Sequence, residues 1–207
     1  MMAKRFSSKS EKGFSLMELI ITLTLLSIVL AGIYTLYFYV QTGFNMTDAR
    51  SEINHQINFT FMQMTNDIRS ASKPNNETMA VKVVSQYEML VYTQNKESKY
   101  IVISYKINTE KKILQRGWVE CAAKIPPEEK NPSYGKIENW ETVMEGVLES
   151  ASIPDGDYTS CFLDITDADT NERREISITL IGNDSNRPLN QPIVSVKTLT
   201  SRSKGSP

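Results

Sequence analysis

The sequence predicts an α+β protein in which one long N-terminal helix packs on an antiparallel β-sheet head. Three observations predict this class. The chain begins with a long uncharged apolar segment, continues as an amphipathic stripe with helical spacing, and ends in short β-branched and aromatic segments between polar turns. Its 207 residues are enough for one ordinary domain with an accessory segment.

The apolar segment, residues 14–40, is predicted to be a membrane-crossing helix. It follows a leader, residues 1–13, in which four basic residues against Glu11 give a local charge of +3. From Leu19 to Val40 there are 22 uncharged residues, which span about 33 Å as a helix and so cross a bilayer core of roughly 30 Å. The hydroxyls of Thr22, Thr24 and Ser27 are expected to bond back to helix carbonyls.

The helical signal continues through residues 41–72 as an amphipathic stripe. Apolar residues recur there at steps of three or four: Met46, Ala49, Ile53, Ile57, Phe61, Met64 and Ile68. No proline occurs before Pro74, so a single helix from about Phe14 to Ala71 is predicted, its second half packed on the head. His55 has no Cys or His at ligand spacing and is interpreted as a polar surface residue.

Residues 73–199 are predicted to form the β-rich head, and residues 200–207 a frayed polar tail. The breaker cluster Ser70–Asn76 ends the helix. The predicted strands are Glu88–Thr93, Lys99–Ile107, Lys112–Val119, Tyr158–Ile165, Glu175–Ile181 and Ile193–Leu199. Between them, Cys121–Asn139 is expected to be a long loop, and Trp140–Leu148 a short helix or irregular strand.

Composition excludes several function classes. The net charge is −1, without the basic excess typical of nucleic-acid binding. One histidine and two cysteines leave little material for a metal site or acid–base catalysis. We therefore expect no enzyme, no metal and no cofactor.

The apolar N-terminal segment has several interpretations, and the single carboxylate of Glu18 helps to distinguish them. A secretory signal peptide could be cleaved after Val29–Ala31, but the apolar run continues to Val40. A plain membrane anchor leaves Glu18 unexplained, since a carboxylate at the edge of an anchor costs about 1–3 kcal/mol.

Residues Lys12–Leu19, KGFSLMEL, supply a third interpretation, because they resemble the signal of type IV prepilins and type II secretion pseudopilins. Gly13, Phe14 and Glu18 match that signal, as do the basic leader and the uninterrupted apolar stretch. The resemblance implies cleavage between Gly13 and Phe14, N-methylation of Phe14, and a role for Glu18 in assembly. Glu18 would pair with the Phe14 amine of a neighbouring subunit.

A second resemblance concerns the head. Asp67–Ala71 at the helix end, and a hairpin returning as Ile113–Arg116, are similar to the larger minor pilins of the PilW and J-type pseudopilin class. The sequence lacks two features of major type IV pilins: the proline about twenty residues into the mature helix and the cysteine pair near the C-terminus.

The resemblance implies a minor pilin or pseudopilin in a low-copy priming or tip complex. Its implied partners are other minor pilins, the major pilin, a prepilin peptidase, an assembly platform protein and, before assembly, membrane lipid. The chain would cross the inner membrane once, with its N-terminus inside and its head outside. On that oxidising side Cys121 and Cys161 are expected to pair. The alternative is a single-pass anchored binding module that never enters a filament.

Overall fold

The computed structural model of the chain describes residues 15–73, 79–94, 99–121, 136–166, 173–184, 189 and 191–202. The chain divides into two compact units, Met1–Asn45 and Met46–Pro207. One helix, α1, runs from Leu16 to Ser70, 55 residues in all, and belongs to both. The predicted single helix is confirmed to within a residue at its C-terminal end. Phe14, its predicted start, lies outside the described residues.

The second unit contains a five-stranded antiparallel sheet in the order β1-β2-β3-β4-β5. The strands are β1 (Val81–Ser85), β2 (Glu88–Gln94), β3 (Tyr100–Asn108), β4 (Ile113–Glu120) and β5 (Asn139–Glu145). Strands β2, β3 and β4 coincide with predicted ones. The edge strand β1 was not predicted; it forms because Val81, Lys82 and Val83 pair with the first half of β2.

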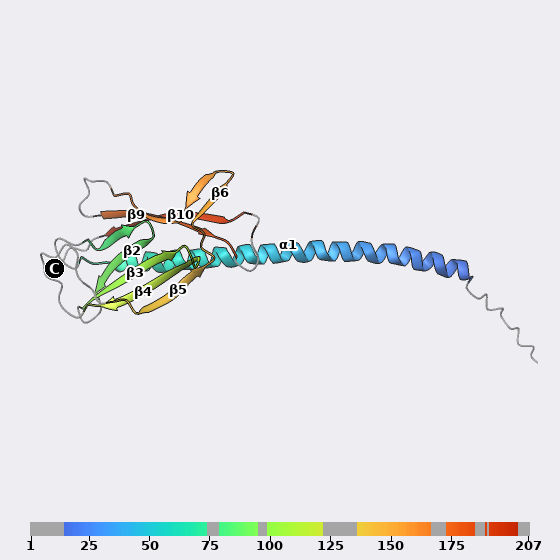
Figure 1. The fold of residues 1–207 in the computed structure, drawn as a ribbon, viewed down its shortest axis with the longest axis horizontal. Helices are drawn as coiled ribbons and strands as arrows, with labels where there is room; N and C mark the ends of the chain where they lie inside the picture. Colours follow the sequence, from blue (N-terminus) through green and yellow to red (C-terminus); the bar gives the residue numbers. More distant parts are fainter. Residues whose placement is uncertain are drawn as a thin grey trace, which may run out of the picture. The chain divides into compact units, whose positions relative to one another are not determined.

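A second, three-stranded antiparallel sheet has the order β10-β9-β8, and its strands β9 and β10 are drawn above the first sheet in Figure 1. Its strands are β8 (Cys161–Asp164), β9 (Arg173–Gly182) and β10 (Ile193–Arg202), and a hairpin of β6 (Ser150–Ile153) and β7 (Gly156–Thr159) precedes them. Strand β10 is longer than predicted, because Thr200, Ser201 and Arg202 pair with β9. The predicted frayed tail is therefore wrong for these three residues, and residues 203–207 lie outside the described ranges.

The segment Trp140–Leu148 is the irregular strand of the two predicted alternatives. It forms β5 and then leaves the first sheet at Gly146, which adopts a positive φ of 69°. A Cβ on Gly146 would lie 1.8 Å from the Asn183 carbonyl oxygen, so only glycine fits this crossing. Val147 then bridges to Gly182, and the chain passes from the first sheet to the second.

The predicted strand Tyr158–Ile165 is divided in two at Ser160. The Ser160 hydroxyl donates to the Leu148 carbonyl (2.6 Å) and accepts from the Ile181 amide (3.0 Å). The Ser160 amide still donates to the Glu149 carbonyl (2.8 Å), so the side chain adds two backbone contacts where the chain turns from the β6–β7 hairpin into the second sheet. A hydroxyl that serves the backbone in this way has no periodic signature in sequence.

The core of the second unit lies between α1 and the two sheets. The helix contributes the buried side chains of Ile53, Ile57, Phe61, Met64 and Ile68. The five-stranded sheet adds residues such as Met89, Tyr105 and Leu114, and the three-stranded sheet adds Phe162, Ile176, Ile178 and Leu180. The stripe identified in the sequence is this buried face, Met46 excepted, which is 43% exposed.

The far face of the five-stranded sheet carries a second buried cluster: Leu90, Tyr92, Val102 and Cys121. The predicted loop Cys121–Asn139 follows directly from it. Residues 122–135 of that loop lie outside the described residues, and Asn139 already belongs to β5.

Candidate assembly site

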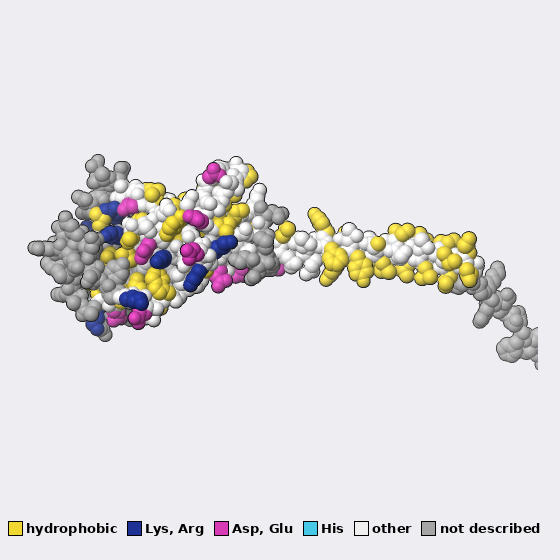
Figure 2. Space-filling model, viewed as in Figure 1, with side chains coloured by type: hydrophobic (Ala, Val, Ile, Leu, Met, Phe, Trp, Pro, Cys, Tyr) yellow, Lys and Arg dark blue, Asp and Glu magenta, His cyan; other side chains and the backbone are white. Residues whose placement is uncertain are grey.

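The N-terminal part of α1 is an exposed apolar surface. Every described residue from Ser15 to Thr47 is exposed, and Glu18 is the only charged one among them. Hydrophobic side chains lie along the visible face of this part of the helix in Figure 2. Leu23, Leu25 and Ile28, for example, are 56%, 59% and 64% exposed. A helix that is apolar on all sides must be covered by lipid or by other helices.

The segment is long and apolar enough to cross a membrane. Its backbone polar groups are bonded within the helix, as lipid requires. The hydroxyls of Thr22, Thr24 and Ser27 donate to the carbonyls of Glu18, Ile20 and Thr24 at 2.7–2.8 Å. This confirms the predicted back-bonding and leaves these side chains without an unsatisfied donor.

Glu18 lies in the first turn of α1. Its amide donates to the Ser15 carbonyl at 2.9 Å, and the Leu19 amide donates to the same oxygen at 3.1 Å. A carboxylate at this end of a helix interacts favourably with the unpaired amides and the helix dipole. Its predicted neighbours Gly13 and Phe14 lie outside the described residues.

At its C-terminal end, α1 is fixed to the sheet by a charged cluster that sequence reasoning did not assemble. The Asp67 carboxylate accepts hydrogen bonds from the Tyr105 hydroxyl (2.6 Å) and the Arg116 Nε (2.9 Å). Arg116 also donates to Glu141 on β5 at 3.2 Å, and its guanidinium lies 5.6 Å from the Trp118 ring centroid. Asp67 and Arg116 belong to the two segments that carried the second resemblance.

Burial sets the electrostatics of this cluster. Tyr105 is fully buried, and that burial, together with the charge of Asp67 and their hydrogen bond, raises the pKa of Tyr105 above its ordinary range. Burial alone would lower the pKa of Arg116, but the hydrogen bond and charge of Asp67 raise it. Asp67 and Arg116 are only 15% and 17% exposed, so each charge depends on the other for its solvation.

The two cysteines are not brought together. Both are free thiols. The Cys121 amide donates to Tyr100 at one end of the β2–β3 pair, whereas the Phe162 amide, next to Cys161, donates to Gln86 at the other end. Seven residues of β2 lie between these points, about 20 Å of strand, and a disulfide needs Cα atoms within roughly 7 Å. The expected bridge is therefore not formed in this structure, because the two cysteines lie at opposite ends of the sheet.

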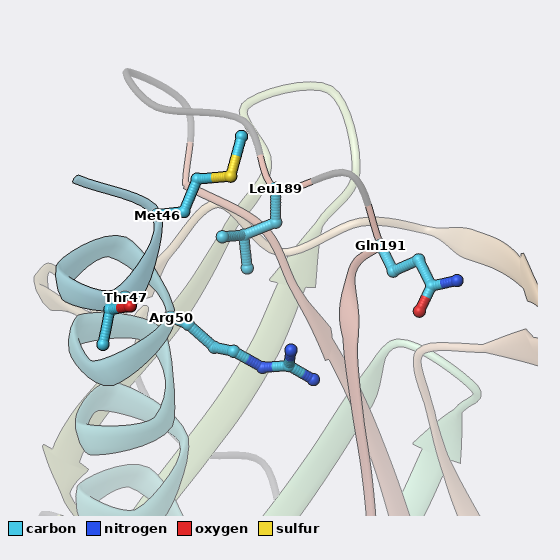
Figure 3. A pocket seen from close by; sticks show the side chains of 5 residues that line it. All are labelled: Met46, Thr47, Arg50, Leu189 and Gln191. Atoms are coloured by element: carbon cyan, nitrogen blue, oxygen red, sulfur yellow. The ribbon is translucent and has the colours of Figure 1, made fainter. Parts of the chain in front are cut away.

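A hollow of about 530 Å³ lies beside the start of the second unit. Figure 3 shows Arg50 reaching from α1 toward the backbone near Gln191, with Met46 and Leu189 above it. Its described lining contains no carboxylate, thiol or imidazole. Nor do the described residues contain a group of three His, Cys, Asp or Glu side chains that could hold a metal ion. This part of the chain therefore does not add a catalytic constellation to the assembly surface.

Comparison with known protein families matches residues 8–34 to the prokaryotic N-terminal methylation motif. No match was found among curated proteins. The matched span begins in the basic leader, includes Gly13, Phe14 and Glu18, and continues into the exposed apolar helix. The motif is that of structural proteins rather than enzymes. The chain thus carries a prepilin-like N-terminal methylation motif on the long helix of a pilin-like α+β fold.

Proposed function

We propose that the chain is a minor pilin or pseudopilin, a low-copy structural subunit of a type IV filament machine. The observation that carries this proposal is the methylation motif over residues 8–34, which leads into a helix whose one charge before Asp48 is Glu18 and whose first buried residue is Ala49. Such a surface serves two successive environments, lipid before assembly and neighbouring helices after it.

Processing is the first step. A prepilin peptidase cleaves between Gly13 and Phe14 and leaves a mature chain of 207 − 13 = 194 residues. The apolar segment stays with the mature chain, so the protein remains anchored after cleavage. The leader carries +3, whereas Asp48, Arg50 and Glu52, the first charges beyond the span, sum to −1. This asymmetry favours an N-terminus inside and a head outside.

Glu18 specifies assembly. Cleavage creates an α-amine on Phe14 that stays cationic when N-methylated. In a stack of subunits, Glu18 of one chain pairs with this amine on another, and the charge-assisted contact fixes the axial offset between them. In lipid the same carboxylate is poorly solvated, so assembly removes a cost of about 1–3 kcal/mol.

The head supports a minor rather than a bulk role. A major subunit needs a compact head that tiles identically along a filament, whereas this head has two sheets, a separate hairpin and long connections. A subunit of a low-copy priming or tip complex does not need a compact head of this kind, because it does not repeat along the filament. Its partners are other minor pilins, the major pilin and an assembly platform protein.

N-terminal sequencing of the membrane-purified protein tests the proposal. The expected terminus is N-methylated Phe14, and in cells lacking the peptidase the leader should remain. The alternative, an anchored binding module outside any filament, keeps its leader in both cases and would overturn the proposal. Sheared filaments made mainly of this chain would contradict the minor role alone.

A further inference from the structure

The outer edge of strand β10 is open in the described part of the head. The other sheet edges are engaged. Strand β8 meets the end of β1, where the Phe162 amide donates to the Gln86 carbonyl at 2.8 Å, and on β5 the Glu145 amide donates to the Gln56 side chain of α1 at 3.3 Å. Strand β10 pairs with β9 on one side only, and no described residue bonds to its backbone on the other side.

The hydrogen bonds of β9 show which way its backbone groups point. The Ile181 amide donates to the Ser160 hydroxyl and the Glu175 amide donates to the Thr166 hydroxyl, each at 3.0 Å. Ser160 precedes β8 and Thr166 lies just beyond it, so both acceptors are on the β8 side of β9. Ile181 and Glu175 therefore direct their backbone groups toward β8 and away from β10.

Every second residue of β10 directs its backbone groups to the open side. Residues directly opposite each other in an antiparallel pair exchange both hydrogen bonds or neither. Val194 lies opposite Ile181, and Thr200 lies opposite Glu175, so Val194 and Thr200 point their amides and carbonyls away from β9. The pairing of β9 with β10 runs without a bulge, so the alternation holds along the strand. The outward-facing set is Val194, Val196, Thr198, Thr200 and Arg202.

A row of alternating backbone donors and acceptors fixes the class of partner. An extended strand offers the complementary row at the same spacing, and strand addition to an open sheet edge is a general mode of peptide recognition. Natural sheet edges are blunted by prolines, bulges or charged side chains. From Ile193 to Ser201, β10 has neither a proline nor a bulge, and Lys197 is its one charge. The edge can therefore pair along its length, and Lys197 is the residue that makes pairing selective.

Lys197 restricts the sequence of an added strand. Its ammonium lies 5.5 Å from the centroid of the buried Phe61 ring, and the ion pairs of the described residues do not include it. Because its backbone groups point toward β9, Lys197 faces an added strand at a position where opposite side chains approach closely. A strand without a counter-charge would desolvate the ammonium at a cost, whereas an Asp or Glu opposite Lys197 forms a cross-strand ion pair.

A second copy of β10 is a poorer occupant than an acidic strand. Ile193–Arg202 contains no Asp or Glu, so no register of two copies places a carboxylate opposite Lys197. Pairing centred on Lys197 would place two ammonium groups against each other, which destabilises a strand pair. The charge of the edge therefore favours a different sequence as its partner.

We propose that the outer edge of β10 binds an extended segment of a second protein as an additional antiparallel strand, with an acidic side chain opposite Lys197. Hydrogen bonds to the outward-facing backbone groups supply affinity, and the ion pair with Lys197 supplies specificity. This inference goes beyond the proposed function, because it concerns an edge of the head and does not depend on processing at Phe14.

Amide hydrogen exchange of the full-length chain in detergent, followed residue by residue with NMR, tests the edge. The probe is a short capped peptide that alternates threonine and valine around one central glutamate. It should slow exchange at Val196 and Thr198 about tenfold or more. Exchange at Lys197 and Leu199 should stay unchanged, because these amides already bond to β9. A control peptide with lysine at its centre should bind about tenfold more weakly.

Charge reversal tests the selectivity. Lys197→Glu should reverse the preference, so that the lysine peptide protects the same amides better than the glutamate peptide. The matched control is Lys106→Glu, because Lys106 is an exposed lysine on β3 of the other sheet; this variant should keep the preference of the parent chain. Thr198→Pro removes one outward amide that the fold does not use and should weaken binding of the glutamate peptide about tenfold. If the proline variant does not fold, Lys197→Glu still decides the question.

The outcomes separate this inference from its alternatives and from the proposed function. Failure of both peptides to protect the outward amides, or a preference that Lys197→Glu leaves unchanged, would overturn it. Protection of the same amides without peptide, rising with protein concentration, would place a second copy on the edge and would also overturn it. An uncleaved leader in the parent chain would remove the proposed function and leave this inference standing.

Discussion

The two parts of α1 are built from the same kind of element but are stabilised differently. From Met46 onward the helix buries one side: Ile57 is 2% exposed and Met64 is fully buried. Before Met46 no described side chain is buried, although this part is the more apolar of the two. Apolar content therefore does not predict burial within the chain; the arrangement of the apolar residues around the helix does.

The difference shows what each part needs. A one-sided stripe matches a sheet on one side and water on the other, so it can be satisfied within one chain. An apolar surface on all sides exceeds what one head can cover, and it must be covered by lipid or by other subunits. The first part of α1 is thus a surface for lipid or for other subunits, and the second part is mainly an intramolecular surface.

The most direct test of this difference is to remove an aliphatic side chain from each part of α1 and to compare the effects on the stability of the head. Ile57→Ala should lower the free energy of unfolding of the head by about 2–5 kcal/mol, through lost burial and a cavity. Leu26→Ala, at a position 51% exposed, should leave head unfolding unchanged. Thermal unfolding of the full chain in detergent measures both. Equal losses would mean that the first part also supports the head.

Removal of the charged anchor at the helix end should have the next largest effect. Asp67→Ala leaves the largely buried Arg116 with only its 3.2 Å contact to the more exposed Glu141, leaves the Tyr105 hydroxyl without its acceptor, and should cost about 2–4 kcal/mol. Glu141→Gln is the matched control, because the Glu141 side chain is 45% exposed and an exposed pair contributes at most about 1 kcal/mol. Urea unfolding of both variants is the measurement. Similar losses would show that Asp67 acts as a surface charge.

The same cluster predicts a loss of stability at high pH. The pKa of Tyr105 is raised above its ordinary value of 10.0 by burial and by Asp67, so above pH 10 the unfolded chain releases a proton that the folded chain keeps. Stability from this group is complete below pH 10 and falls by about 1.4 kcal/mol per pH unit above it.

Tyr105→Phe isolates that loss from all other titrations. The variant is less stable than the parent at pH 8, because Asp67 loses a hydrogen-bond donor. The stability gap should narrow between pH 10 and 11, since only the parent loses the tyrosine contribution. If the free energies of unfolding of the parent and the variant changed in parallel between pH 10 and 11, the raised pKa of Tyr105 would be contradicted.

The sequence predicted the features that depend on periodicity and local spacing. The 3.6-residue stripe located the buried face of α1. Segments rich in β-branched and aromatic residues located β2 and β3, with alternation in β3, and the turn after β3 located β4. The signal at Gly13, Phe14 and Glu18 was recognisable because its residues are contiguous. These features are local, so a single sequence carries them.

The features that the sequence did not predict depend on residues far apart in the chain. Asp67 and Arg116 were both noted, yet nothing in one sequence shows that a helix end and a strand 49 positions later meet. The break at Ser160 depends on Leu148 and Ile181. The predicted Cys121–Cys161 bridge was wrong for the same reason. An oxidising compartment and the presence of two cysteines do not show how far apart the two residues lie in the fold.

The smallest expected effect again compares the two parts of α1, through one hydroxyl in each. Thr60 is fully buried, and its Oγ1 has no hydrogen-bond partner within the described part of the chain. An unsatisfied buried hydroxyl costs about 1–3 kcal/mol, and valine has nearly the same shape. Thr60→Val should therefore raise the free energy of unfolding by about 1 kcal/mol.

Thr24→Val is the counterpart, since that hydroxyl bonds to the Ile20 carbonyl at 2.8 Å on an exposed surface; head unfolding should not change. Calorimetry of the two variants measures the difference. A loss of stability in Thr60→Val would show that the Thr60 hydroxyl has a hydrogen-bond partner in solution and that water reaches this buried face of the helix.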